Sequence, residues 1–309
     1  RIYWDLYGLK KWSYNNNIKP DLIISLQNTT INFDNDTVPQ ISYVMQAIPF
    51  VDRKWSPFKK SERSLWFYKN IYPFFMSMNL GKKHYVVTQS KWIKHEFIKK
   101  FKFPKEKIFA IRPIIKISNC TEKIKFNNED YNIFCPSSAF VYKNNREIAN
   151  AIAYLKSNGQ DVSMLKVHIT INKNDDPMLL DAIIKNKLTN NFNFIGRITY
   201  ENMLAFYNSS DLVVFPSYLE TFGLPLLEAA SFGKPIIVSN EGYAQEVISK
   251  YKGAKLIDIN SPKKWGDAIL DEVNNGETYN KYKADFKESW KDLFTLIIKI
   301  IKKEGMKGV

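Results

Sequence analysis

The chain has 309 residues, and 45% of them are hydrophobic, so it can form the core of one large domain or two medium-sized ones. No apolar run approaches the roughly 18 to 20 residues of a membrane-spanning helix, and the two cysteines, Cys120 and Cys135, lack the spacing of metal ligands. The net charge of +14 is uneven, with 21 basic against 8 acidic residues in 1–120 and 24 against 23 in 121–309, which predicts two parts with different partners.

The first part of the chain contains short apolar segments of the kind that form buried strands. Strands are expected at residues 22–26, 40–44, 85–88 and 108–113, with a helix at residues 91–101. This pattern is that of the C-terminal half of a Rossmann-like domain, without the first strand and its glycine-rich loop. We therefore expect an incomplete N-terminal domain over residues 1–117, with a polar linker at residues 114–128.

The second part alternates short apolar strands with amphipathic helices. Strands are expected at residues 133–135, 165–171, 192–195, 212–215, 235–238 and 256–257, and helices at residues 146–156, 177–187, 200–208, 224–232, 243–249 and 262–273. Such alternation predicts an α/β domain, here residues 118–285, with a parallel sheet between two layers of helices. Ligands of these sheets bind at the carboxyl ends of the strands.

One motif carries most of the chemical information. Residues 215–228 read FPSYLETFGLPLLE, which places two carboxylates, Glu220 and Glu228, around a turn that opens a helix. A helix N-terminus attracts anions, and a carboxylate accepts hydrogen bonds from sugar or ribose hydroxyls. The motif therefore predicts a pocket for a nucleotide sugar.

This motif and its surroundings resemble the retaining glycosyltransferases of family four, in which a Glu-x7-Glu motif lies in the donor-binding domain. The residues that carry the resemblance are Gly196, Tyr207, Ser210, Asp211, Pro216, Ser217, Glu220, Phe222, Gly223, Leu224, Pro225, Glu228, Ala229, Gly233, Lys234, Pro235 and Glu246. The resemblance implies the GT-B fold, in which two Rossmann-like domains face each other across a cleft. The N-terminal domain is then truncated here, and the segment 286–309 is a helix that crosses back to it.

The resemblance also implies roles for the donor-site residues. Lys143 lies where the family places a lysine against the donor diphosphate, a task suited to a point charge. Glu220 is implied at the sugar hydroxyls and Glu228 at the ribose. Ser138 stands where the family usually has an arginine, and Arg197 is our candidate for the missing second cation.

The turn between the two glutamates, Thr221-Phe222-Gly223-Leu224, completes the expected donor site. The backbone N–H groups of Phe222, Gly223 and Leu224 can stabilise charge on the leaving diphosphate, and glycine lets a ligand approach the backbone closely. A structural turn at a helix start is the alternative for this segment. The resemblance implies no cofactor and no metal, with the leaving phosphate taking the acceptor proton on one face of the sugar.

Acceptor-side residues are expected in the first part of the chain. Met45 stands where many relatives have a histidine near the donor sugar, and Gln46 is the nearest polar substitute. Gln89 follows another expected strand and is the second candidate.

Residues 53–116 hold 17 basic against 3 acidic side chains, interleaved with aromatic residues. This composition suits docking on an anionic membrane surface, binding to a nucleic acid, or a solvated basic surface. The resemblance favours the membrane, because many members of the family act on lipid-linked oligosaccharides, so we expect a cytoplasmic enzyme on the inner face of the cell membrane and no nucleic-acid partner.

Together these features predict a bacterial, retaining, metal-independent hexosyl- or N-acetylhexosaminyltransferase that uses a UDP- or GDP-sugar. Its expected acceptor is a lipid-linked glycan of O-antigen, lipopolysaccharide or capsule synthesis. Two alternatives stay open: a sugar-nucleotide epimerase or sugar phosphorylase of the same fold, and a basic nucleic-acid-binding protein.

Overall fold

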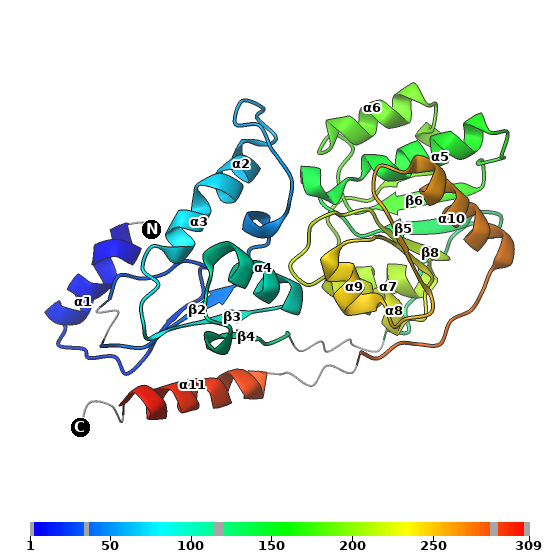
Figure 1. Cartoon of the computed structure of the whole chain (residues 1–309). Helices are drawn as coiled ribbons and strands as arrows, with labels where there is room; N and C mark the ends of the chain where they lie inside the picture. The colour runs from blue at the N-terminus through cyan, green and yellow to red at the C-terminus, as the bar shows by residue number, and fades with distance from the viewer. Residues whose placement is uncertain (1–2, 34–36, 114–119, 285–289, 306–309) are drawn as a thin grey trace. The chain divides into compact units, whose positions relative to one another are not determined.

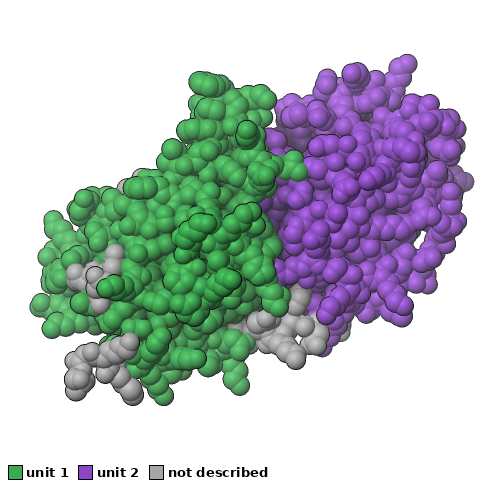
Figure 2. Space-filling view, in the orientation of Figure 1, with its two compact units in different colours: residues 1–114, 286–309 green, residues 115–285 purple. Residues whose placement is uncertain are grey.

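The computed structural model describes residues 3–33, 37–113, 120–284 and 290–305 (Figure 1). The chain divides into two compact units (Figure 2): unit 1 contains Arg1–Ile114 and Phe286–Val309, and unit 2 contains Ile115–Asp285. The domain boundaries expected at 117/118 and 285/286 lie outside the described residues and stay predictions.

Unit 1 is built on a parallel sheet with the strand order β1-β2-β3-β4. Its strands are β1 (Ile23–Ser25), β2 (Gln40–Val44), β3 (His84–Thr88) and β4 (Ile108–Ala110). Every residue of β2 and β3 is buried, which is typical of a parallel sheet covered on both faces. The four predicted strands are confirmed, although the first and last are shorter than expected.

Helices of unit 1 include several that the sequence did not predict. The helices are η1 (Trp4–Gly8), α1 (Leu9–Asn15), η2 (Ile48–Phe50), α2 (Arg63–Asn70), α3 (Tyr72–Ser77), α4 (Lys91–Phe101), η3 (Lys105–Lys107) and α11 (Trp290–Gly305). Only α4 and α11 match expected helices. The others are short, and α2 buries just one side chain, Leu65, so no helical period of apolar residues identifies it.

The C-terminal helix α11 packs on the sheet of unit 1. Leu293, Leu296 and Ile300 are buried in one cluster with β2 and β3 residues such as Ile41 and Val87. The Tyr85 hydroxyl of β3 also donates to Glu304 Oε1 at 2.8 Å. Unit 1 is therefore formed from the two ends of the chain. Among the described residues, no helix is both long and apolar enough to cross a membrane.

Unit 2 has a parallel sheet with the strand order β10-β9-β8-β5-β6-β7. Its strands are β5 (Tyr131–Cys135), β6 (Leu165–Ile169), β7 (Phe192–Phe194), β8 (Leu212–Phe215), β9 (Ile236–Ser239) and β10 (Ala254–Ile257). The chain runs outward from β5 to β7, then returns to β8 beside β5 and runs outward in the other direction. This reversal makes the boundary of β5 and β8 the switch point of the sheet, where such folds bind ligands.

Helices cover both faces of this sheet (Figure 1). They are η4 (Val141–Lys143), α5 (Arg146–Ser157), α6 (Pro177–Lys185), η5 (Thr189–Asn191), α7 (Tyr200–Ser209), α8 (Leu224–Ser231), α9 (Gly242–Ile248) and α10 (Pro262–Asn275). The largest core cluster joins α5, α6 and α10 to one face, to which β5 contributes Ile133 and Cys135. Phe134 points to the other face and stacks on Phe206 of α7 at 5.0 Å. All six strands and six helices predicted for this part are confirmed.

Candidate active site

Lys143 and Glu220 meet at the switch point of the unit 2 sheet. Lys143 ends η4 in the loop after β5, and Glu220 lies in the loop between β8 and α8. Because β5 and β8 are neighbours, their loops emerge side by side, and Lys143 Nζ lies 2.5 Å from Glu220 Oε1. The side chains are 18% and 22% exposed, so the ion pair is partly shielded yet open to a ligand.

The Glu220 carboxylate is held in one orientation. Ser217 Oγ donates to the same oxygen, Oε1, at 2.9 Å, and the Tyr243 hydroxyl of α9 donates to the Ser217 carbonyl at 2.7 Å. The other oxygen, Oε2, accepts no hydrogen bond from the described residues. Glu220 therefore keeps one carboxylate oxygen for a ligand hydroxyl while Lys143 and Ser217 fix the other.

The loop that carries Lys143 is fixed to its neighbours. The Tyr218 N–H donates to the Tyr142 carbonyl at 3.0 Å and joins the two loops. Buried Asn145 donates to the carbonyl of Ser138 at 2.9 Å and to Asp176 at 3.1 Å. Ser138 thus lies in the same loop as Lys143, where the sequence placed it, and contributes a carbonyl to the loop's own bonding.

The N-terminus of α8 follows directly after Glu220. Gly223 takes a left-handed conformation with φ of 86°, and a Cβ there would lie 3.0 Å from the Tyr243 ring, so glycine is required. The N-cap residue is Gly223 itself, which has no side chain with which to cap the helix. Thr221 follows Glu220 in the chain. The next residue, Phe222, is buried, and Leu224 is 39% exposed. The turn therefore presents backbone N–H groups at a helix N-terminus beside the Lys143–Glu220 pair.

Glu228 is the fifth residue of α8 and is surrounded by tyrosines. Burial raises the pKa of its carboxyl group, and the nearby hydroxyls of Tyr207 and Tyr200 oppose that rise. The Tyr207 hydroxyl is buried and acts on Glu228 at a distance, since it forms no hydrogen bond of ordinary geometry with the described residues. Glu228 is thus a partly buried carboxylate in a setting of hydroxyl groups.

Arg197 is not part of this cluster. It is exposed and follows β7, the edge strand, and two strand spacings of about 5 Å each separate β7 from β5. It forms no ion pair with a described residue. Its role as a second cation stays a prediction.

The two acceptor-side candidates lie in unit 1 after neighbouring strands. Gln46 follows β2 and Gln89 follows β3, and the ends of these strands, Val44 and Thr88, are paired in the sheet. The Gln46 side chain accepts from the Ile48 N–H at 3.2 Å and so caps a local turn. The acceptor roles of both residues stay predictions.

The sequence did not single out several side chains that organise the site. Ser217 lies within the family pattern, but the pattern predicts no role for it, nor for Tyr142, Asn145 or Tyr243. The position of Ser217 three residues before Glu220 was a usable signal, because a hydroxyl at that distance can return to a carboxylate across a turn. Tyr243 acts from α9, so only the tertiary structure reveals it. No three His, Cys, Asp or Glu residues of the described ranges gather as potential metal ligands.

Known proteins resemble the chain in sequence and in fold. It is 27% identical to the uncharacterised glycosyltransferase MJ1069 of Methanocaldococcus jannaschii over 94% of this chain and 76% of that protein. It is 24% identical to the O-antigen chain mannosyltransferase RfbU of Salmonella typhimurium over 65% of this chain and 54% of that protein. The chain spans about half the length, or less, of most of the curated relatives that it matches.

Solved structures show the same fold. HepE of Anabaena, crystallised with UDP and glucose, aligns with a TM-score of 0.55 and 16% identity over 77% of this chain and 63% of that chain. Two α/β units with parallel sheets and these neighbours establish the GT-B fold. The family model of the glycosyl transferases group 1 matches residues 119–289. That segment is more than half of the chain and includes Lys143, Glu220 and Glu228, and the chain therefore belongs to the group 1 glycosyl transferases.

Proposed function

We propose that the chain transfers a sugar from a nucleotide-diphosphate sugar to a glycan acceptor, with retention of configuration and without a metal ion. The observation that carries the proposal is the Lys143–Glu220 pair beside the N-terminus of α8, at the switch point of the unit 2 sheet. This arrangement offers a cation, backbone donors and a carboxylate within one small region.

Each group has a task in the proposed reaction. Lys143 and the N–H groups of the α8 turn stabilise the diphosphate as the bond between the anomeric carbon and its phosphate oxygen breaks. Glu220 Oε2 accepts a hydrogen bond from a sugar hydroxyl and orients the ring. The acceptor oxygen bonds to the same face of the anomeric carbon, and its proton passes to the leaving phosphate oxygen.

Relatives support the donor class and one class of acceptor. HepE was crystallised with UDP and glucose, and GtfA of pneumococcus with UDP and GlcNAc. RfbU is named an O-antigen chain mannosyltransferase. We therefore propose a UDP- or GDP-hexose or N-acetylhexosamine as donor and a lipid-linked glycan, as in O-antigen or capsule synthesis, as acceptor.

The proposed lipid-linked acceptor requires contact with a membrane. Unit 1 carries the basic residues of 53–112, and its helix α11 exposes Trp290, Phe294 and Ile298 beside exposed lysines. Aromatic and apolar side chains with flanking lysines suit the headgroup region of an anionic bilayer. We propose that unit 1 docks on the inner face of the cell membrane.

One experiment tests the reaction class. Thermal-shift assays over UDP-, GDP- and ADP-sugars should identify a donor, because a ligand at a hundred times its Kd stabilises the fold by about 2.7 kcal/mol. Product analysis with that donor in labelled form should then show transfer to an added glycan. Interconversion of the donor without an acceptor would instead indicate an epimerase, and phosphate-dependent release of the sugar would indicate a phosphorylase. No stabilisation by any nucleotide sugar would contradict the proposal.

A further inference from the structure

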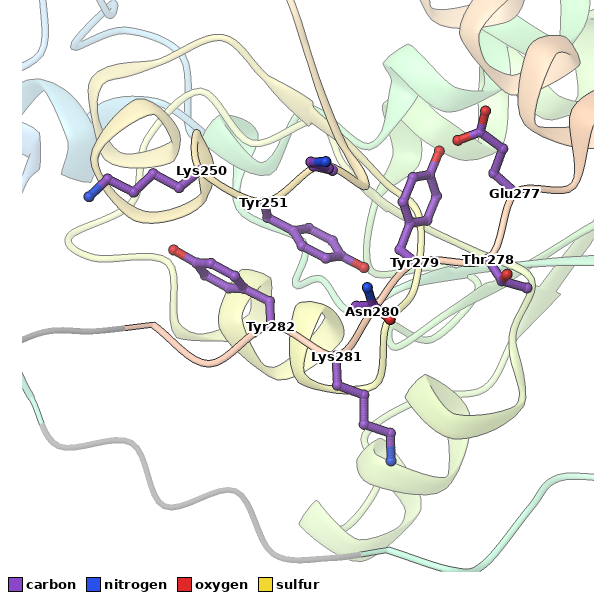
Figure 3. A pocket seen from close by; sticks show the side chains of 9 residues that line it. Lys250, Tyr251, Glu277, Thr278, Tyr279, Asn280, Lys281 and Tyr282 are labelled. Carbon is purple, nitrogen blue, oxygen red and sulfur yellow. The ribbon is translucent and has the colours of Figure 1, made fainter.

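Unit 2 also has a pocket outside the candidate active site (Figure 3). It is lined by residues 250–252, which directly precede β10, and by residues 277–282, which follow α10. The strands are parallel, so this is the amino end of the sheet, separated from the candidate active site by strands of four or five residues at about 3.3 Å each. Its volume of about 400 Å³ is within the range of small-molecule sites.

The walls of this pocket are fixed although they contain no helix or strand. The Tyr251 hydroxyl donates to the Lys234 carbonyl at 2.9 Å, and the Tyr282 N–H donates to the Ala230 carbonyl at 2.8 Å. Gly233 packs against the segment 277–282, and a Cβ added at Gly233 would lie 2.5 Å from the Tyr279 carbonyl oxygen. The pocket is therefore a formed feature of unit 2.

Three tyrosine rings form the inner surface. The Tyr251 ring lies 6.1 Å from Tyr279 and 5.5 Å from Tyr282, and Figure 3 shows the three rings gathered together. Tyr251 is buried, while Tyr279 and Tyr282 are half-buried and offer ring surface and hydroxyl groups to a ligand. Burial and the neighbouring carboxylates, Glu272 and Glu277, raise the pKa of Tyr279 to about 12.

Three lysines stand at the rim. Lys250, Lys252 and Lys281 are exposed, and Figure 3 shows Lys250 and Lys281 extending outward on different sides of the rings. Within the described part of the chain, none of the three forms an ion pair. The single acidic lining residue is Glu277. The pocket thus combines amphipathic aromatic surface with an excess of positive charge on long, flexible side chains.

We propose that this pocket binds an acidic glycan, with sugar rings on Tyr279 and Tyr282 and carboxylate or phosphate groups at Lys250 and Lys281. This rests on the proposed function, since it names the class of acceptor as a negatively charged chain. Single-stranded nucleic acid, which also uses aromatic and basic residues, fits less well. The rings are tilted by 63° and 40° to Tyr251 rather than parallel, so they form no series of stacking platforms.

Binding here would keep a growing chain on the enzyme between transfers. A glycan held at one end of unit 2 raises the effective concentration of its free end near the protein without any change in the chemistry of the donor site. Because lysines at a surface supply the charge recognition, this binding should weaken with salt.

The test is calorimetric titration of the full chain with hexagalacturonate, whose rings carry carboxylates, and with its methyl ester, which has the same rings without charge. We expect hexagalacturonate to bind and the ester to bind at least tenfold more weakly. The variant Lys250→Gln/Lys281→Gln should lose at least tenfold in affinity for hexagalacturonate. The control Lys125→Gln/Lys185→Gln removes the same charge from exposed positions of unit 2 outside the pocket and should bind as the unmodified chain does.

The ring surface is tested separately with Tyr279→Leu, which should weaken hexagalacturonate binding, and circular dichroism of each variant shows that it is folded. Equal binding of acid and ester, or equal binding by the two double-lysine variants, would overturn the proposal. Tighter binding of a single-stranded oligouridylate that displaces hexagalacturonate would also overturn it. Nucleotide-sugar binding is measured on the same variants and should not change. If neither the original chain nor any variant binds a nucleotide sugar, the proposed function is rejected, whereas the glycan site is still tested by hexagalacturonate binding.

Discussion

The ammonium group of Lys143 and the hydroxyl of Ser217 share one oxygen of Glu220, so the two charged side chains position each other. A diphosphate offers Lys143 a second anionic partner, while Glu220 keeps its contact with Ser217. In the proposed reaction, Lys143 would then contact the phosphate and Glu220 the sugar when a donor binds.

Substitution of either partner should reduce turnover with little effect on folding. We expect Glu220→Gln and Lys143→Met each to lower kcat/KM by about a hundredfold or more, because each removes a group that stabilises or orients the reacting centre. The double variant should lose much less than the product of the two effects, since the side chains act as a unit. Steady-state kinetics measure turnover, and thermal melts measure the stability of the fold. The matched control is Lys59→Met, which breaks the exposed Lys59–Glu62 pair of unit 1. Activity within threefold of the original in either single variant would remove that residue from the site.

Glu228 gives the donor site a predicted pH dependence. Burial raises the pKa of its carboxyl group above the usual 4.5, so the folded form takes up a proton at a higher pH than the unfolded chain. If Glu228 holds the ribose as proposed, the carboxylate is lost as an acceptor for the ribose hydroxyls as pH falls through the raised value, and donor affinity should fall. In stability terms, the cost of the buried charge is absent below about pH 4.5 and fully present above the raised pKa.

Two measurements check the predicted direction of these changes in donor affinity and stability. Calorimetric titration with a nucleoside diphosphate between about pH 5 and pH 8 should show weaker binding at the acid end, and Glu228→Gln should bind weakly with a flatter profile. At neutral pH the same variant should unfold at a higher temperature than the original chain, because it removes a partly buried charge. Glu201→Gln, an exposed glutamate at the start of α7, is the control and should change neither property. A donor affinity that rises toward acid pH would contradict the role of Glu228.

Among the elements, the segment 277–282 depends on a glycine beneath it. Gly233 has φ of 72°, and any side chain there meets the Tyr279 carbonyl. Gly159 has φ of 80°, but a Cβ added there would meet nothing within 4 Å. Substitution of Gly159 therefore measures the cost of the backbone conformation without a steric clash. Gly159→Ala should therefore cost about 1 kcal/mol of unfolding free energy, and Gly233→Ala about 1–3 kcal/mol more. Chemical denaturation of the two variants measures the difference. Equal losses would show that the segment can move away from Gly233 without cost.

Some of the helices and strands could be predicted from the sequence and others could not. In unit 2, buried strands alternate with helices bounded by proline or glycine, as at Pro262 and Gly276 of α10, so each element could be predicted on its own. In unit 1, α2 and α3 are short and aromatic on most sides, and tertiary contacts rather than periodicity decide their form. The same division holds at the site. Lys143 and Glu220 could be singled out because they match the family pattern in loops that follow strands, whereas the Tyr243–Ser217 bond joins separate elements and could not be predicted.

At the scale of the molecule, the helix α11 connects the end of the chain to the start. One side of it, with Leu293, Leu296 and Ile300, completes the core of unit 1. Trp290, Phe294 and Ile298 are 46%, 61% and 54% exposed, and the Trp290 ring also stacks on Tyr43 of β2. The spacing of four residues puts these three side chains on one stripe. An apolar stripe of this kind beside exposed lysines is a suitable membrane contact, because it adds apolar burial to charge attraction.

Binding to lipid vesicles tests the role of that stripe directly. In flotation with vesicles of phosphatidylglycerol and phosphatidylcholine, Phe294→Glu should reduce the bound fraction several-fold, since it places a negative charge against an anionic surface and removes an apolar side chain from it. Ile184→Glu is matched to it, because Ile184 is also 61% exposed but lies on α6 of unit 2. That control should float like the original chain, and raised salt should weaken binding of both. If the two variants float equally well, the stripe is not the membrane contact. If the original chain does not float at low salt, the membrane role of unit 1 is excluded under these conditions, whereas turnover on a soluble glycan acceptor would still measure the chemistry at Lys143 and Glu220.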